Sequence, residues 1–182
     1  MTDATWQPRN SGLVWHKMNE SAAKEIASWQ YEGNAAFYNT RNEDMEATVV
    51  AFCEPAHRYH YVTRSADGRI FAFCCFGEDA RVPGGKYDEN ALDVGISIHP
   101  RSIGRGWGKQ ILSLAMEFAC CEYQASRFRA TIAAFNERAL RMCRTAGFQE
   151  CFYFLQPENR CRYFVLVLDR SKSQSVSHQQ GG

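Results

Sequence analysis

A short segment of this chain combines glycine with positive charge where a strand is expected to end and a helix to begin. Residues 98–109 read Ile-His-Pro-Arg-Ser-Ile-Gly-Arg-Gly-Trp-Gly-Lys. The first amides of a helix lack backbone partners, and the helix dipole favours negative charge at that end. Arg105 and Lys109 add positive charge beside those amides. The segment therefore predicts a binding site for phosphate groups, and for pyrophosphate in particular.

The glycine spacing excludes two common phosphate-binding motifs. The dinucleotide fingerprint G-x-G-x-x-G requires glycine directly after Gly108, where this chain has Lys109. A P-loop, G-x-x-x-x-G-K-S/T, fails as well, because its first glycine and its hydroxyl residue fall on Ile103 and Gln110. The pyrophosphate would have to belong to another class of ligand.

A second segment of the chain indicates which class of pyrophosphate-containing ligand this is. Residues 136–148 read Asn-Glu-Arg-Ala-Leu-Arg-Met-Cys-Arg-Thr-Ala-Gly-Phe. This resembles the pattern Asn-x-x-Ala-Ile/Leu-x-Leu-Tyr-x-x-x-Gly-Phe of the GNAT N-acetyltransferases. Residues 98–108 resemble the coenzyme A loop of the same family, Val-x-Pro-x-x-Arg/Gln-Gly-x-Gly-x-Gly/Ala, without a gap. Because the two motifs stand in the family's order and at about its spacing, the chain is identified as a member, with the resemblance covering about residues 92–148.

The resemblance implies acetyl-CoA as the acyl donor and no metal. In the family, backbone groups of the strand before the glycine loop pair with the pantetheine arm, and the loop holds the pyrophosphate. Asn136 has two expected roles, as the N-cap of the following helix and, by resemblance, as a contact to the cofactor arm. The cofactor-binding residues implied are Ile96, Ser97, Ile98, Gly104, Arg105, Gly106, Trp107, Gly108, Lys109 and Asn136.

The chain departs from the family at three positions. Ile103 stands where the loop usually has Arg or Gln, Thr131 where some members have a Glu base, and Cys143 where many have a Tyr acid. We take Asp93 and Cys143 as the catalytic candidates. Cys143 is either a proton donor or an inert buried thiol, and Asp93 acts through water, binds a cationic amine, or is a hydrogen-bonded carboxylate at a strand start. Weaker candidates in the preceding loop are Tyr87, Asp88 and Glu89.

The resemblance implies an N-acetyltransferase that moves an acetyl group to a primary amine by direct attack in a ternary complex. The acceptor would be a small molecule or a peptide. The alternative is an acyl-CoA-binding module with weak or lost catalysis, favoured by the three departures. Aromatic side chains at 29–38 occupy the region that shapes the acceptor pocket in the family, or they belong to the core. Arg138, Arg141 and Arg144 share a helix face that either approaches the nucleotide phosphates or is solvated.

Charge and composition narrow the function classes further. The 182 residues carry 21 Lys or Arg and 20 Asp or Glu, a balance that argues against a nucleic-acid-binding protein with a broad basic face. No apolar run approaches the roughly 20 residues that span a bilayer, and the first residues lack the features of a signal peptide. We therefore expect a cytoplasmic protein without nucleic-acid or membrane partners.

Cysteine usage agrees with a reducing compartment. The eight cysteines include no C-x-x-C pair, and most lie in apolar segments, where free cysteine behaves as a small buried side chain. A zinc site from Cys53, His57 and His60 lacks a convincing fourth ligand. We expect free thiols and no metal.

The remaining pattern places these groups on one α/β domain at 1–170, followed by a polar tail at 171–182 expected to be disordered. We expect helices at 21–29, 42–52, 106–121 and 136–146, with Ser21 and Asn42 as caps of the first two. Strands are expected at 57–63, 69–77, 92–98, 127–134, 149–156 and 162–168. The fold class is a mixed, mostly antiparallel central sheet flanked by helices on both faces. Gly95 marks either a bulge or a close contact, and the C-terminal hairpin offers an edge for a homodimer.

Overall fold

A seven-stranded sheet organises the protein, in a computed structural model that describes Trp6 and residues 12–171. The strands lie in the order β1-β2-β3-β4-β5-β7-β6, and every neighbouring pair is antiparallel except β4 and β5. Their bounds are β1 Leu13–Lys17, β2 His60–Arg64, β3 Ile70–Phe76, β4 Leu92–Ile98, β5 Arg127–Ala133, β6 Gln149–Leu155 and β7 Arg162–Asp169. The tail expected at 171–182 lies, apart from Ser171, outside the described residues.

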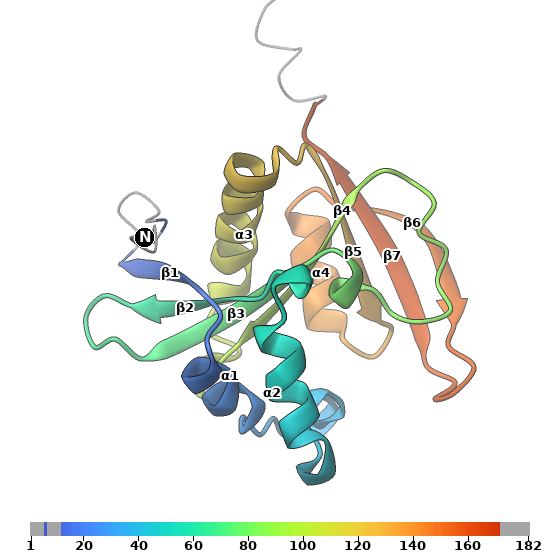
Figure 1. Ribbon diagram of the computed structural model, residues 1–182. Coiled ribbons are helices and arrows are strands. Elements are labelled where there is room, and N and C mark those ends of the chain that lie inside the picture. The colour runs from blue at the N-terminus through green and yellow to red at the C-terminus, as the bar shows by residue number, and fades with distance from the viewer. Residues whose placement is uncertain (1–5, 7–11, 172–182) are drawn as a thin grey trace, which may run out of the picture.

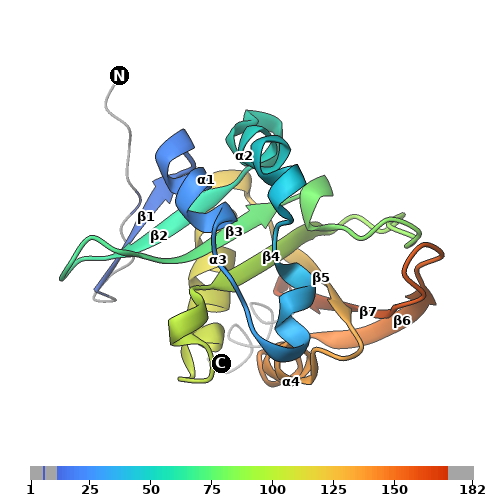
Figure 2. The ribbon, with the colours of Figure 1, turned by 90° about the horizontal axis from the view of Figure 1, so that it is seen from below.

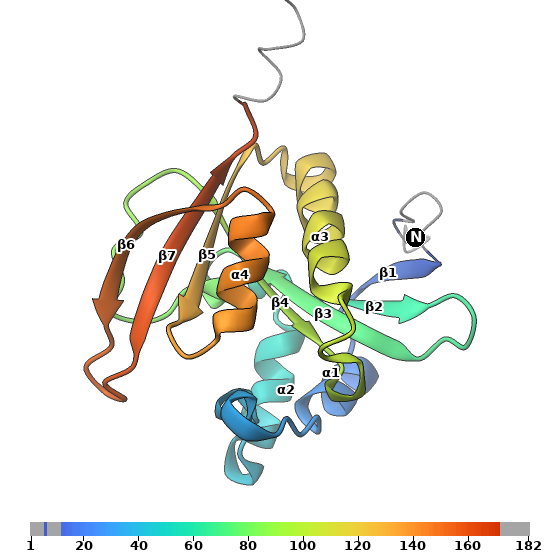
Figure 3. The same ribbon diagram turned by 180° about the vertical axis from the view of Figure 1, so that it is seen from behind.

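Helices cover both faces of this sheet. Helices α1 and α2 lie on one face, and α3 and α4 on the other (Figures 1 and 3). Figure 2 shows the sheet between the two pairs from below. The helices are α1 Glu20–Ala27, α2 Met45–Cys53, α3 Trp107–Tyr123 and α4 Glu137–Thr145. This architecture confirms the expected mixed sheet with helices on both faces.

The sequence pattern predicted no strand before residue 57, and this was wrong. Strand β1 begins at Leu13 and pairs with β2, and the side chains of Leu13 and Trp15 are buried. Its alternation is only five residues long, so the sequence pattern was too short to identify it. Helix α1 is capped by Asn19, whose Oδ1 accepts from Ala22 N at 2.9 Å, and not by Ser21. Asn42 starts a short 3-10 turn that precedes α2.

The largest core cluster fills the space between the sheet and α3. Ile111, Leu114 and Phe118 of α3 follow helical spacing and are buried, whereas Cys121, one turn after Phe118, is exposed. Phe118 stacks on Trp15 with ring centroids 5.0 Å apart. This packing fixes α3, and with it the glycine loop at its start.

His60 lies inside this aromatic core. It is 9% exposed, its ring centroid is 4.6 Å from that of Phe118, and its Nε2 lies 3.3 Å from Tyr123 Oη. Burial lowers the pKa of His60 to about 4 from 6.5. The charged imidazolium is therefore disfavoured in the folded state.

A pH-dependent stability follows from His60. Because the unfolded chain binds the proton more tightly, this contribution is complete above pH 6.5 and is lost as the pH falls toward 4. The loss amounts to about 3 kcal/mol at most. Urea unfolding at a series of pH values is expected to show a steeper fall for the wild type than for His60→Gln in this window. Parallel curves for the two proteins would contradict the assignment.

The parallel contact between β4 and β5 is short. The two strands pair at Leu92–Phe128 and Asp93–Arg129 and then diverge (Figure 3). Gly95 lies just past this point, and its register with β3 continues without a shift. A Cβ on Gly95 would lie 3.0 Å from Cys75 Sγ. Close packing against β3, and not a bulge in the β3–β4 pairing, therefore accounts for this glycine.

The cysteines are free thiols, all eight of them within the described part of the chain. In residues 6 and 12–171, no three His, Cys, Asp or Glu side chains gather in a way that could hold a metal ion. The same residues contain no helix long and apolar enough to cross a membrane.

Candidate functional site

The glycine loop turns the chain from the end of β4 into α3. Gly104 and Gly106 both have φ of +83°, which favours glycine over residues with a side chain. Gly106 is the N-cap of α3, and no side chain caps the helix. Residues 104–106 are exposed, and a Cβ on Gly106 would meet nothing within 4 Å. The first amides of α3 therefore open toward solvent, as an anion site requires.

The other predicted residues of the loop are a packed tryptophan and two exposed cations. Trp107 is half-buried and packs edge-on against Phe71, with ring centroids 5.1 Å apart. Arg105 and Lys109 are exposed on either side of it. The tryptophan fixes the first turn of α3, and the two cations stand two residues before and after it.

Strand β4 presents a backbone edge with no partner among the described strands where it leaves β5. Gly77 N donates to Asp93 O at 3.0 Å and His99 N donates to Phe71 O at 2.9 Å, so odd-numbered residues of β4 bond to β3. In an antiparallel ladder the alternate residues point the other way. Ile96 and Ile98 therefore direct their N–H and C=O groups into the divergence between β4 and β5.

Ser97 has the opposite orientation. Its backbone belongs to the β3 ladder, and its Oγ lies 2.9 Å from the Tyr31 hydroxyl. The same hydroxyl donates to Ile98 O at 3.3 Å. Of the three β4 residues predicted to pair with a ligand through their backbone, Ile96 and Ile98 face the divergence and Ser97 does not.

Asn136 lies at the end of β5 and starts α4. Its Oδ1 accepts from Ala139 N at 3.2 Å, which confirms the predicted N-cap. Its Nδ2 donates to Tyr38 Oη at 3.3 Å. Phe37 and Tyr38 are 48% and 45% exposed and pack on Phe135. The aromatic side chains at 29–38 therefore have two different locations. Trp29 is buried in the core, whereas Phe37 and Tyr38 form an exposed surface beside Asn136.

Asp93 is buried in an ion-pair cluster. Its carboxylate is 1% exposed, and Arg129, which is 2% exposed, donates to Oδ1 from Nε at 2.6 Å and to Oδ2 from Nη2 at 2.7 Å. Arg81 Nε donates to Oδ2 at 2.8 Å. Both oxygens are therefore occupied by guanidinium groups. This favours a structural role for Asp93 over the base or amine-binding role that its sequence position suggested.

Cys143 and Thr131, the position where some family members have a Glu base, have similarly closed surroundings, whereas the weaker candidates Asp88 and Glu89 are exposed. Cys143 is buried, and burial raises the pKa of its thiol to about 12, which favours the inert interpretation. Thr131 Oγ1 lies 3.4 Å from the Tyr87 hydroxyl, which also bonds to the backbone N and O of Val82 at 2.9 Å. Neither Thr131 nor Cys143 therefore has the free, deprotonatable character of a general base.

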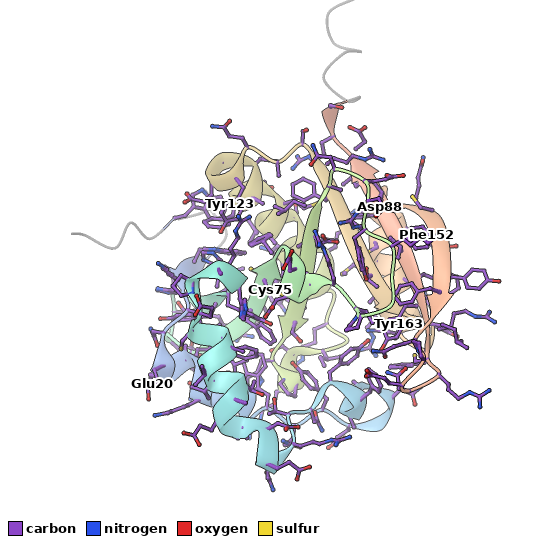
Figure 4. All side chains as sticks on the ribbon, turned by 45° about the vertical axis from the view of Figure 1, so that its right-hand side comes forward. Glu20, Cys75, Asp88, Tyr123, Phe152 and Tyr163 are labelled. Atoms are coloured by element: carbon purple, nitrogen blue, oxygen red, sulfur yellow. The ribbon has the colours of Figure 1, made fainter. Side chains whose placement is uncertain are left out.

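The loop between β3 and β4 covers the β5–β7–β6 part of the sheet. The guanidinium carbons of Arg81 and Arg129 lie 5.3 and 4.8 Å from the centroid of the Tyr87 ring. A Cβ on Gly84 would lie 3.5 Å from Pro157 Cδ in the β6–β7 turn. Figure 4 labels Asp88 in this loop, in front of the strands. The sequence of this loop offered only weak candidates for catalysis, although Arg129 inside an apolar strand was a signal that a buried partner exists.

The whole arrangement suits an extended ligand with an anionic end. The open amides of α3 can hold phosphate groups, and the edge at Ile96 and Ile98 can bond to amide groups of a chain lying between β4 and β5. The hydroxyls of Tyr31 and Tyr38 lie beside this edge, and burial raises the pKa of both, so each is protonated near neutral pH.

Comparison with known proteins gives one family. The model of the Acetyltransferase (GNAT) family matches residues 22–148. No curated protein matches the chain.

Solved structures share the fold at low sequence identity. A chimeric spermidine N-acetyltransferase from Vibrio cholerae and hSSAT is 16% identical, with a TM-score of 0.69 over 90% of this chain and 99% of that one. A GNAT-family acetyltransferase from Bacillus anthracis is 14% identical, with a TM-score of 0.67 over 88% and 96%. A putative acetyltransferase from Salmonella typhimurium, solved with acetyl-CoA, is 14% identical, with a TM-score of 0.62 over 88% and 95%.

Proposed function

The chain belongs to the GNAT acetyltransferase family, and we propose that it transfers an acetyl group from acetyl-CoA to a primary amine. The observation that carries the proposal is the coincidence of two features. The first feature is the series of open backbone groups that runs from the unpaired edge of β4 to the first amides of α3. The second is the divergence of β4 from β5 alongside that edge. An extended pantetheine arm with a pyrophosphate fits that sequence of donors and acceptors.

The residues that would hold the donor follow from their positions. Gly104, Gly106 and the first amides of α3 would hold the pyrophosphate, and Ile96 and Ile98 the amide groups of the arm. The Asn136 amide lies at the end of β5 and would complete this set. When bound, acetyl-CoA supplies an activated thioester, so the amine needs only to be neutral and correctly oriented. We propose direct attack in a ternary complex, with Tyr31 and Tyr38 as hydroxyl donors and neither Asp93 nor Cys143 moving a proton.

The acceptor is proposed only by class, as an amine-bearing small molecule or peptide. Its entrance would lie on the face that carries α1, α2 and the β3–β4 loop. The exposed rings of Phe37 and Tyr38 form part of that face. Several structural neighbours are named spermidine N-acetyltransferases, so polyamines belong in the first set of amines to test.

A thermal-shift titration with acetyl-CoA tests donor binding, and thiol release with an amine panel tests transfer. We expect a rise in melting temperature and thiol release with at least one small amine, polyamine or peptide N-terminus. Absence of binding would contradict the proposal. Binding without thiol release across the panel would favour the second candidate, an acyl-CoA-binding module. Turnover that persists in Cys143→Ala would support an inert thiol.

Asn136 offers a test that separates its two roles. Aspartate and serine both keep the N-cap, so the unfolding free energies of Asn136→Asp and Asn136→Ser are expected to stay within about 0.5 kcal/mol of wild type. Both variants lack the amide donor, and we expect the Kd for acetyl-CoA to rise about three- to tenfold. Calorimetric titration and urea unfolding measure the two effects. Unchanged affinity in Asn136→Ser would show that Asn136 acts only as a cap.

Strand β6 offers a surface through which two copies of the chain could associate. Strand β6 is an edge strand, and Phe152, Tyr153 and Leu155 on it are exposed. Apolar side chains on an open edge favour pairing with another strand. We propose a homodimer through β6, for which light scattering is expected to give twice the mass of the chain, and Tyr153→Lys the mass of a monomer.

A further inference from the structure

Arg138 of α4 extends toward the glycine loop from a different part of the chain. A Cβ on Gly104 would lie 3.9 Å from Arg138 Nη1, so the guanidinium lies directly over the exposed loop. Among residues 6 and 12–171, the Arg138 side chain has no hydrogen bond or ion pair. In contrast, Arg144 two turns later is paired with Glu150. Arg138 is thus an unpaired cation beside an open row of amides.

Gly108 explains why α4 comes so close. A Cβ on Gly108 would lie 2.6 Å from Met142 Sδ and 3.9 Å from Ile98 Cδ1. The first turn of α3 therefore contacts Met142 where Gly108 has no side chain. Arg138 precedes Met142 by one helical turn and lies on the same face of α4. The contact at Gly108 thereby aligns Arg138 with Gly104.

The glycine loop has an apolar residue, Ile103, immediately before Gly104. An isoleucine side chain carries no hydrogen-bond donor, so position 103 offers none to an anion. Arg105 and Lys109 are exposed cations of the loop and the first turn. A guanidinium from α4 therefore supplies a forked donor that position 103 lacks, and such groups suit phosphate oxygens.

We infer that Arg138 is a pyrophosphate-binding residue of the donor site, supplied by α4 in place of a polar side chain at position 103. The inference rests on the proposed function, since it names a residue of the same acetyl-CoA site. It assigns Gly108 to helix–helix packing and leaves Gly104 and Gly106 to face the anion. Arg141, one turn further along α4, is then a solvated residue.

The experiment measures the Kd for coenzyme A by calorimetry in wild type, Arg138→Gln and Arg141→Gln. The last is a matched control with the same charge change on the same helix. We expect about a tenfold rise in Kd for Arg138→Gln and less than about a twofold rise for Arg141→Gln. The double variant Ile103→Arg/Arg138→Gln is expected to recover most of the loss. Equal losses in the two glutamine variants would overturn the inference, because they would show a general charge effect.

Dephospho-coenzyme A distinguishes the phosphates. If Arg138 binds the pyrophosphate, the ratio of Kd values between Arg138→Gln and wild type is the same for both ligands. A ratio that falls to one with the dephospho form would overturn the pyrophosphate assignment in favour of the ribose phosphate. Failure of wild type to bind coenzyme A would instead refute the proposed function, so the two failures are distinguishable. Urea unfolding of each variant checks that the fold is retained.

Discussion

Replacement of Asp93 by asparagine is expected to destabilise the protein by about 3–5 kcal/mol. The change removes the negative charge between Arg129 and Arg81 while keeping the size of the side chain. Arg129 is 2% exposed and cannot reach water without local opening, so it becomes a buried and uncompensated cation. Because the cluster joins β4 to β5 at the last point where they pair, its loss also loosens the start of the divergence.

The matched control is Glu89→Gln. Glu89 pairs with Arg127, and the side chains of Arg127 and Glu89 are 39% and 58% exposed. An exposed pair contributes about 0–1 kcal/mol, so this variant should unfold near the wild-type midpoint. Urea unfolding near neutral pH compares the two variants. A stable Asp93→Asn protein that has lost acetyl transfer would restore the catalytic role considered from sequence.

Replacement of Gly106 by aspartate is expected to weaken acetyl-CoA binding about thirtyfold more than replacement by asparagine. Both side chains face the same positive φ and the same open space, so their steric and conformational costs are nearly equal. Only the aspartate puts a negative charge at the open end of α3. Its repulsion of a nearby pyrophosphate amounts to about 2 kcal/mol at the surface of a protein, which corresponds to that factor.

Calorimetry with acetyl-CoA and urea unfolding of both variants measure this prediction. Aspartate is also a good N-cap, so Gly106→Asp is expected to be at least as stable as Gly106→Asn. Weaker binding then cannot be attributed to unfolding. Equal affinities of the two variants would place the pyrophosphate away from the start of α3 and refute the proposed donor site. Added salt is expected to reduce the difference between them.

Much of the fold could be predicted from the sequence, and so could the cap at Asn136. The predicted bounds of β4 were correct, and those of α3, β5, α4, β6 and β7 lay within two residues of the observed ends. Their signals are local, because alternation, helical periodicity and capping depend on neighbours a few residues apart. Strand β1 and the cap at Asn19 were missed, since a five-residue strand carries little periodic signal.

The chemistry of individual side chains was harder to predict. Asp93 looked like a catalytic carboxylate because its position on β4 was known and its partners were not. Those partners stand 12 and 36 residues away along the chain. Whether an acid is free, paired or buried depends on such distant contacts, and no spacing rule records them. The same is true of Tyr31 at Ser97 and of Tyr38 at Asn136.

The glycine loop shows which features the local sequence determines and which depend on tertiary packing. Its composition and its position between a strand and a helix were enough to predict an anion site, because open amides and positive φ are properties of the local backbone. Only the tertiary structure shows which of its glycines are exposed and which one packs against another helix. Gly104 and Gly106 face outward, while Gly108 admits Met142 and brings Arg138 over the loop. That arrangement arises where α3 packs against α4, and such packing joins residues that the sequence keeps more than a strand and a helix apart.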